Sequence, residues 1–292
     1  MLPFGPAQRF RSPRRPRGFS LIELLVVIAI VGVTMSILLP ALGHARRAAA
    51  TAADMASLSQ VMTGYAVYSN DHRGALLPGY LPTAWASENP PPGVTPWEIF
   101  DNEGVRLHGV RAQRYPWRLA PYFDYNFSAL YKDPRLLERY REREDFQYVV
   151  SVSPSFGINA DFVGGKALPG FGFNPAALRQ WGPFYITRID EARRPDHLVV
   201  FASAHGVDPD GGAPVPGYFE VSSPNLLERR WTFEYDAEDP PTVHGNVHAR
   251  YEGRTMTGQL DGHASLLKMA ELDDMRRWSN QATRADWTLG AR

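Results

Sequence analysis

The chain has 292 residues, of which 44% are apolar and 21% charged, a composition that excludes a disordered or collagen-like protein. Its formal charge is zero, but residues 1–18 hold five arginines and no acidic residue, so the rest has 26 basic and 31 acidic residues, a net charge of −5. A mildly acidic body is unsuited to sequence-blind DNA binding, and we expect no nucleic acid partner. Cysteine is absent, which excludes disulfides, a catalytic thiol and thiolate metal sites.

The first structural element that the sequence predicts is a membrane-spanning helix. Residues 24–43 are 20 consecutive residues without a charged side chain. At about 1.5 Å rise per residue, a helix of this length spans the hydrocarbon core of a bilayer, which is ~30 Å thick. The arginines before it orient the leader toward the cytoplasm and the body outward. We expect the transmembrane part at about residues 21–39.

Three interpretations of this segment are open. A cleaved secretory signal has a shorter apolar core, ~7–15 residues, and a small-residue cleavage site, which the alanine-rich sequence after Pro40 could imitate. A plain single-pass anchor leaves Glu23 unexplained, because a carboxylate in an apolar helix is costly in lipid and usually has a partner. The third interpretation accounts for the glycine, the acidic residue and the apolar run together.

The order Gly18, Phe19, Glu23, apolar run and Pro40 resembles the prepilin signal of type IV pilins and type II secretion pseudopilins. The resemblance implies that prepilin peptidase cleaves between Gly18 and Phe19 and methylates the new terminal amine. It also implies that Glu23 neutralises the amine of a neighbouring subunit as a filament grows, and that Pro40 kinks the helix. Such pairing is physically sensible, because unpaired charges in a low-dielectric layer cost several kcal/mol each.

The helical pattern continues beyond Pro40. The spacing of Met55, Leu58, Met62 and Tyr65 predicts one apolar stripe, which we expect the head to cover. Small residues predict an adjacent face that either admits neighbouring helices or merely reflects the helix propensity of alanine. These residues are Ala45, Ala49, Ala52, Ala56, Ser59 and Ala66.

Turn-forming residues at 70–74 end the predicted helix. The expected domains are a cleaved basic leader at 1–18, a helix at 19–70 and a globular head outside the cytoplasm at 71–292.

The head carries strand and turn signals. β-Branched and aromatic residues predict strands at 146–152, 197–202 and 218–222. Residues 255–260 and 263–269 flank Asp261-Gly262, a dipeptide typical of a type I′ hairpin turn. The expected fold is α+β and pilin-like, with a long N-terminal helix, transmembrane and then amphipathic, packed on an antiparallel β-sheet head with large loops.

Five short segments of the chain resemble a narrower subfamily, the prepilin-type processing-associated His-x9-Asp-Gly proteins. In that subfamily a histidine precedes the Asp-Gly pair, but Tyr251 stands at its position and the nearest histidine is His248. The resemblance makes Asp261, Gly262 and His263 the family turn motif. The segments are Tyr68–Asp71, Trp117–Tyr122, Ser155–Asn159, Leu198–Phe201 and Leu260–His263.

Metal sites and catalysis have weak signals only. His244 and His248 could be drawn as zinc ligands, but the glutamate of the metalloprotease motif is absent and Gly245 is a poor helix residue. We therefore expect no enzyme activity. No cofactor is expected either, with calcium as the alternative, because two oxygen-rich loops lack a complete ligand spacing. The calcium candidates are Asp208, Asp210, Asp236, Glu238 and Asp239.

These patterns predict a pilin-like or pseudopilin structural subunit of a type IV pilus or type II secretion-type filament. The expected partners are prepilin peptidase, other subunits in a homo- or heteropolymer, an inner-membrane assembly platform and membrane lipid. The expected location is the bacterial inner membrane, single-pass, with the head in the periplasm or outside, and also the filament. Two alternatives are a membrane-tethered binding head (adhesin or substrate receptor) that forms no long filament, and a tethered metal-dependent hydrolase.

Overall fold

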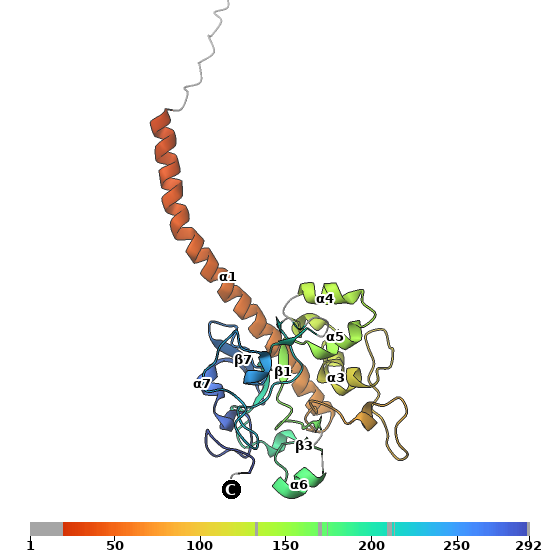
Figure 1. Cartoon of the computed structure of the whole chain (residues 1–292). Coiled ribbons are helices and arrows are strands. Elements are labelled where there is room, and N and C mark those ends of the chain that lie inside the picture. Colours follow the sequence, from red (N-terminus) through yellow and green to blue (C-terminus); the bar gives the residue numbers. More distant parts are fainter. Residues whose placement is uncertain are drawn as a thin grey trace, which may run out of the picture. The chain divides into compact units, whose positions relative to one another are not determined.

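The structure is a computed structural model that describes residues 20–131, 134–168, 171–173, 175–208, 212 and 214–290. The chain divides into two compact units, Met1–Ala50 and Thr51–Arg292. Helix α1 (Leu21–Asp71) begins in the first unit and ends in the second (Figure 1). The remaining helices are α2 (Val110–Gln113), α3 (Tyr115–Leu119), α4 (Pro134–Arg141), α5 (Phe146–Val152), α6 (Pro175–Trp181) and α7 (Met269–Leu272).

An antiparallel sheet of four strands forms the centre of the second unit, in the order β1-β4-β7-β8. All five residues of β4 are buried, as expected for a central strand. Two small two-stranded sheets, β2-β3 and β5-β6, are also present. The strands are β1 (Phe156–Ile158), β2 (Ala167–Leu168), β3 (Phe171–Gly172), β4 (Val199–Ser203), β5 (Gly206–Val207), β6 (Pro214–Val215), β7 (Arg254–Gln259) and β8 (Ala264–Lys268).

The second half of α1 belongs to the core of the head. Leu58, Met62 and Tyr65 of the predicted apolar stripe are buried, which confirms that the head covers this stripe, and Met55 is partly buried. Every residue of the predicted small-residue face is exposed. The fold is therefore α+β, with a long N-terminal helix and an antiparallel sheet in the head.

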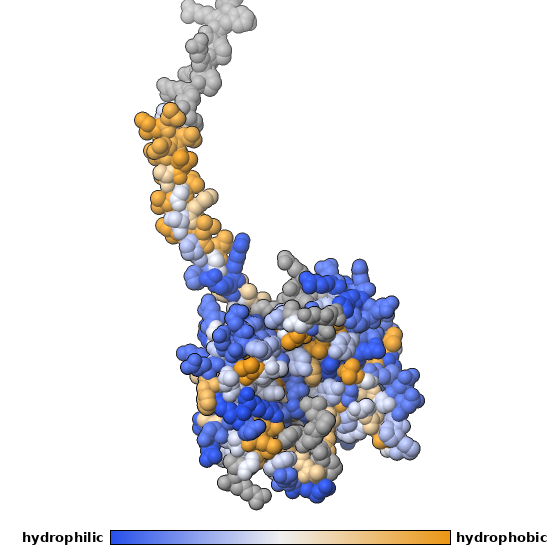
Figure 2. Space-filling view, viewed as in Figure 1, coloured by the Kyte–Doolittle hydropathy of each residue, from blue (hydrophilic) through white to orange (hydrophobic). Residues whose placement is uncertain are grey.

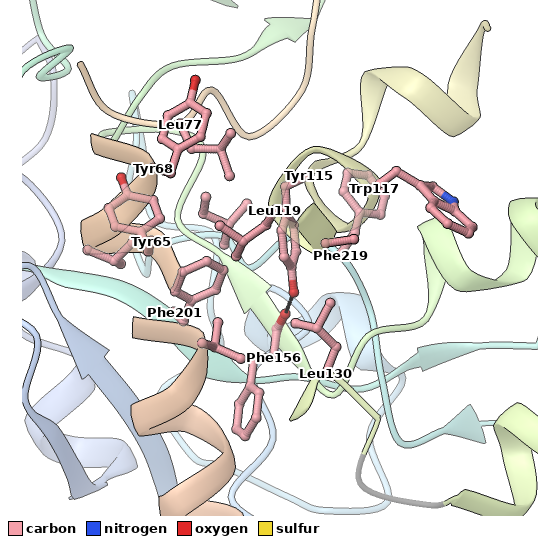
Figure 3. Close-up of a cluster of buried hydrophobic side chains, with 14 of the residues drawn as sticks. Tyr65, Tyr68, Leu77, Tyr115, Trp117, Leu119, Leu130, Phe156, Phe201 and Phe219 are labelled. Carbon is pink, nitrogen blue, oxygen red and sulfur yellow. Dashed lines mark hydrogen bonds between the residues drawn. The ribbon is translucent and has the colours of Figure 1, made fainter. Parts of the chain in front are cut away.

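Aromatic side chains join α1 to the sheet and to α3 (Figure 3). The ring of Phe201 in β4 meets Tyr65 of α1 at a centroid distance of 5.6 Å and Tyr115 of α3 at 5.2 Å, both edge to face. The Tyr115 hydroxyl donates to the carbonyl oxygen of Phe156 at 2.5 Å, so this buried phenol is satisfied by β1. Edge-to-face pairs add about 0.5–1.5 kcal/mol each beyond the area they bury.

Gly258 in β7 lets α1 approach the sheet closely. A Cβ atom at this position would lie 2.5 Å from the Met62 sulfur and 3.4 Å from Leu58 Cδ1. The helix therefore rests where the strand has no side chain.

The predicted strand at residues 146–152 is wrong, because this segment forms helix α5. Its short apolar run has no periodicity that separates a strand from a buried helix, and tertiary contacts decide the outcome. Trp117 Nε1 donates to the Gln147 carbonyl oxygen at 2.8 Å, and Arg114 Nη1 donates to Ser151 Oγ at 3.0 Å. The Tyr131 hydroxyl donates to the Val150 carbonyl. These three bonds hold α5 from outside.

The strand predicted at residues 218–222 does not form, and the segment makes a single bridge instead. The amide nitrogens of Ile158 and Val221 donate to the carbonyl oxygens of Phe219 and Ile158, both at 3.0 Å. Glu220 and Ile158 form this isolated parallel bridge. The segment thus lies beside β1 without extending the sheet. The strands expected at 197–202, 255–260 and 263–269 are confirmed as β4, β7 and β8, with ends shifted by one or two residues.

The turn between β7 and β8 differs from the expected type I′. Gly262 has a φ of +98°, whereas Asp261 has no positive φ, and type I′ needs positive φ at both central residues. The Gly262 amide donates to the Gln259 carbonyl oxygen at 2.9 Å, which makes Leu260 and Asp261 the central pair and places the glycine after them. The Asp-Gly pair therefore predicted the hairpin correctly. Its glycine, however, follows the two central residues of the turn, whereas a type I′ turn would have it as the second of them.

Candidate processing and assembly segment

The first turn of α1 is closed by a reciprocal capping interaction. The Ser20 amide donates to Glu23 Oε2 at 2.8 Å, and the Glu23 amide donates to Ser20 Oγ at 3.1 Å. This Ser-x-x-Glu pattern is a capping box, which satisfies two of the four amides that an α-helix leaves without a partner at its start. Glu23 is fully exposed, and within the described residues no cation forms an ion pair with it.

The following turns of α1 present apolar side chains in every direction. Within the described residues, α1 is the one helix that is long and apolar enough to cross a membrane. No residue of its most apolar stretch, which belongs to the first unit, is buried (Figure 2). Such an all-round apolar surface is typical of a helix that lies in lipid or against other helices. Its most exposed large side chains are Leu21, Ile22, Ile37, Leu39, Leu25, Val33 and Leu38.

Polar groups inside this apolar segment are satisfied within the helix. Thr34 Oγ1 donates to the Val31 carbonyl oxygen at 2.9 Å, and Ser36 Oγ donates to the Val33 carbonyl oxygen at 2.7 Å. Lipid supplies no hydrogen-bond partner, so this internal bonding suits a membrane environment. Pro40 lies inside α1, which continues past it.

The two residues of the predicted cleavage site, Gly18 and Phe19, lie outside the described residues, as does the leader. Their roles, and those of Glu23 in assembly and Pro40 in a kink, stay predictions.

The family turn motif forms a local pair on the surface. His263 Nδ1 lies 2.6 Å from Asp261 Oδ1, and both side chains are more than a third exposed. The backbone amide of His263 also donates to Asp261 Oδ1 at 3.2 Å. The aspartate therefore accepts bonds from its own turn, which is a structural role.

The two histidines drawn above as zinc ligands have separate neighbours. His244 is buried between the rings of Trp231 and Tyr235, and its Nε2 lies 3.0 Å from Thr232 Oγ1. The ring of His248 stacks on His205 at a centroid distance of 4.5 Å. Among the residues that the structure describes, no group of three or more histidine, cysteine, aspartate or glutamate side chains could hold a metal ion.

Three of the calcium candidates, Asp236, Glu238 and Asp239, lie in one local turn. Asp236 Oδ1 accepts from the Glu238 amide at 2.9 Å, and the Asp239 amide donates to the Asp236 carbonyl oxygen at 3.3 Å, so these residues form a turn. Asp208 follows β5, and Asp210 lies outside the described residues. Calcium binding stays a prediction.

A buried charge network was not visible in the sequence. Lys166 Nζ bonds both Asp161 Oδ1, at 2.8 Å, and Glu220 Oε1, and Arg230 Nη1 bonds Asp161 Oδ2 at 2.7 Å. Burial by itself raises the pKa of Asp161, but Lys166 and Arg230 outweigh burial and hold it below its usual value. Burial raises the pKa of Glu220, and Lys166 offsets this only in part. Residue spacing gives no signal for a network whose members lie up to 69 residues apart.

Segments that carry the subfamily resemblance meet in the core of the head. Tyr68, Trp117, Phe201 and Leu260 belong to one buried cluster. Asn159 is fully buried, and its Nδ2 donates to the carbonyl oxygens of Val199 and Trp278, both at 3.0 Å. This amide ties β4 to the C-terminal segment. The roles that the structure shows for these residues are packing and backbone bonding.

The comparison with known proteins identifies the class of the N-terminal segment. A model of the prokaryotic N-terminal methylation motif matches residues 13–39, a stretch that contains Gly18, Phe19 and Glu23. Over this stretch the chain is similar to proteins with a pilin-type signal, which prepilin peptidase processes. No curated protein and no solved structure matches the chain.

Proposed function

We propose that the chain is a pilin-like structural subunit that prepilin peptidase processes and that assembles into a filament through the apolar half of α1. One observation carries the proposal. A charged side chain, Glu23, stands at the start of an exposed apolar helix, within a matched methylation motif and without a cation beside it in the described chain.

The capping box gives Glu23 neutral partners only. Ser20 donates one amide hydrogen bond to the carboxylate, and this bond does not cancel its charge. A glutamine would serve the same cap, since Glu and Gln both occur at this position of capping boxes. Local structure therefore explains a polar side chain at position 23 but not the negative charge.

Cleavage before Phe19 supplies the opposite charge. A new amine at Phe19 would lie one helical turn from Glu23 of its own chain, or beside Glu23 of a neighbouring chain whose helix is displaced along the axis. Pairing the two ions removes the cost that each carries alone in a low-dielectric layer. The exposed apolar surface of α1 then packs between subunits instead of against lipid.

The alternative is a binding head held in the membrane by the same signal. Such a receptor needs cleavage and anchoring, but it needs no charge at position 23. The two functions therefore make different demands on this residue, and a substitution that keeps the cap and removes the charge separates them.

We expect Glu23→Gln and Glu23→Ala to abolish incorporation into filaments, with at least about tenfold less chain in a sheared surface or filament fraction. Ser20→Ala loses half of the capping box, at a cost of about 1 kcal/mol, and keeps the charge, so it should assemble. Mass spectrometry of each mature chain checks processing first, with a terminus at methylated Phe19 expected for all of them.

Assembly by Glu23→Gln at the wild-type level would show that the charge is dispensable and would contradict the subunit proposal. A wild-type chain that retains the arginine-rich leader would contradict it as well, because the amine would never form.

A further inference from the structure

A small pocket in the head is lined in part by a buried arginine, Arg118. The pocket has a volume of about 210 Å³ and lies between the C-terminal end of α1, residues 97–100 and the segment formed by α3 and the 3-10 helix Ala120–Phe123. Six aromatic side chains, the imidazole of His72 and one arginine, Arg118, are among the groups that line it. The aromatic residues are Tyr68, Trp97, Phe100, Trp117, Tyr122 and Tyr125.

Arg118 is buried and uses only part of its bonding capacity. Its Nε donates to the Arg114 carbonyl oxygen at 3.3 Å, and Nη2 donates to the carbonyl oxygens of Gly79 and Gln113 at 3.1 and 3.0 Å. Its Nη1 has no hydrogen-bond partner, and no carboxylate of the described chain forms an ion pair with the guanidinium. The residue is 5% exposed.

The surroundings of Arg118 lower the cost of its charge without cancelling it. Three carbonyl dipoles face the guanidinium, and its Cζ lies 5.9 Å from the ring centre of Trp97, a distance at which an aromatic face attracts a cation. None of these groups carries a negative charge. Burial lowers the pKa of Arg118 to about 10, so the group is still a cation at neutral pH. Buried charges in proteins are normally paired, which leaves a place here for an anion.

The pocket also restricts which anion can enter. It is smaller than the ~300–1,000 Å³ of sites for drug-sized ligands, and its aromatic walls favour a planar apolar body. Guanidinium groups prefer carboxylate and phosphate oxygens. Glu98, which is exposed and also lines the pocket, adds one negative charge at the site and disfavours a doubly charged phosphate.

We propose that this pocket binds a small organic monocarboxylate with a planar apolar body, whose carboxylate reaches Arg118 and whose body lies among the aromatic rings. Residues of the first unit are not needed for this site, and the proposal does not depend on filament assembly. It gives the head a ligand of defined chemistry.

The test compares benzoate with benzamide, which has nearly the same shape and no charge. Titration calorimetry on the full-length chain in lipid nanodiscs, at constant ionic strength, should give benzoate a Kd of about 1 mM or lower. Benzamide should bind at least about tenfold more weakly, because only the carboxylate compensates the buried cation. This comparison uses the unaltered protein, so it does not depend on how a variant folds.

Substitutions then locate the bound carboxylate. Arg118→Gln should weaken benzoate binding at least about tenfold, whereas Glu98→Gln should leave it unchanged or tighten it. Arg111→Gln is the matched control, since Arg111 is exposed and bonds Gln147 outside the pocket. Equal binding of benzoate and benzamide, no saturable benzoate binding, or a loss of binding in Arg111→Gln equal to that in Arg118→Gln would each overturn the proposal.

Discussion

His205 shows how the head controls the protonation of one side chain. It is buried, and its ring stacks on His248. Burial lowers the pKa of His205 to about 4, with smaller contributions in the same direction from Arg250 and His244. An unfolded histidine has a pKa of about 6.5, so the folded state favours the neutral ring.

This shift predicts a loss of stability in acid. The contribution of His205 is fully present above about pH 6.5 and is lost as the pH falls from there toward 4, because the unfolded state takes up a proton that the folded state rejects. We expect the free energy of unfolding to fall by about 1–3 kcal/mol more in the wild type than in His205→Phe, which keeps a ring against His248. Denaturant unfolding of the full-length chain in detergent, from about pH 7 to pH 4, measures the difference.

His197→Phe is the control for this prediction, because His197 is exposed. It should keep the wild-type pH dependence. An identical pH dependence in His205→Phe and the wild type would mean that His205 does not titrate differently in the two states.

At the scale of residues, a charged side chain could be recognised as important from the sequence only where its neighbours along the chain made a charge unusual. Glu23 stands beside 20 uncharged residues, and that contrast marked it as unusual, while its role in assembly was implied by the resemblance to prepilin signals. Arg118 has Trp117 and Leu119 beside it but Arg114 only four residues before it, so its charge was not unusual in the sequence. Lys166 has glycines before it and no carboxylate next to it in sequence, so its ion pairs could not be predicted.

At the scale of elements, the buried charge network holds irregular segments that have little regular structure. Asp161 follows β1, Lys166 precedes β2, and Glu220 lies in the segment that bridges to β1. Arg230, in the loop after the segment of Glu220, connects that loop to the network through its bond to Asp161. These segments share few ladder hydrogen bonds, so the ion pairs fix their relative positions.

Lys166→Met should therefore be strongly destabilising at neutral pH. It leaves Glu220 buried without its cation, and breaking a buried pair by removing one partner costs about 3–5 kcal/mol. The loss should be smaller near pH 5, because protonating Glu220 removes the uncompensated charge, and a carboxyl whose folded pKa is raised gains stability as the pH falls. Thermal unfolding at the two pH values measures both effects.

Arg188→Met removes a cation from an exposed pair with Asp190 and serves as the matched control. Its cost should stay within about 1 kcal/mol at either pH. A Lys166→Met chain as stable as the wild type at neutral pH would show that the network contributes nothing to holding these segments.

Among the elements themselves, periodicity and turn chemistry decided what could be predicted. The 3-4 spacing of Leu58, Met62 and Tyr65 identified the buried face of α1, and Asp261-Gly262 identified the hairpin of β7 and β8. Helix α5 was missed because seven residues are too few for a period, and its helix is held by side chains of Trp117 and Arg114 from elsewhere.

At the scale of the whole molecule, the boundary between the compact units falls inside α1, between Ala50 and Thr51. Burial along the helix agrees with this division, because all of its buried residues lie between Asp54 and Ser69. One continuous helix therefore has an exposed apolar half and a half that is part of the head core. A domain limit drawn at the end of the helix would cut through that core.

This division predicts where the head can be separated from the membrane segment. A truncated chain of residues 51–292 should fold, whereas residues 72–292 should not, because the shorter chain lacks Leu58, Val61, Met62, Tyr65 and Tyr68 of the main core cluster. Burying each such side chain contributes about 1.5–3 kcal/mol, so their joint loss is about as large as the whole stability of a domain, ~5–15 kcal/mol.

Near-ultraviolet circular dichroism and thermal unfolding of the two truncated chains test this prediction. We expect a cooperative transition for residues 51–292 and none for residues 72–292, and a synthetic peptide of residues 51–71 should restore aromatic signals to the shorter chain. Because the sheet contacts α1 through Gly258 and Phe201, we expect docking of the peptide and ordering of β4 and β7 to occur together. Cooperative unfolding of residues 72–292 alone would show that the distal half of α1 lies on the head without being part of its core.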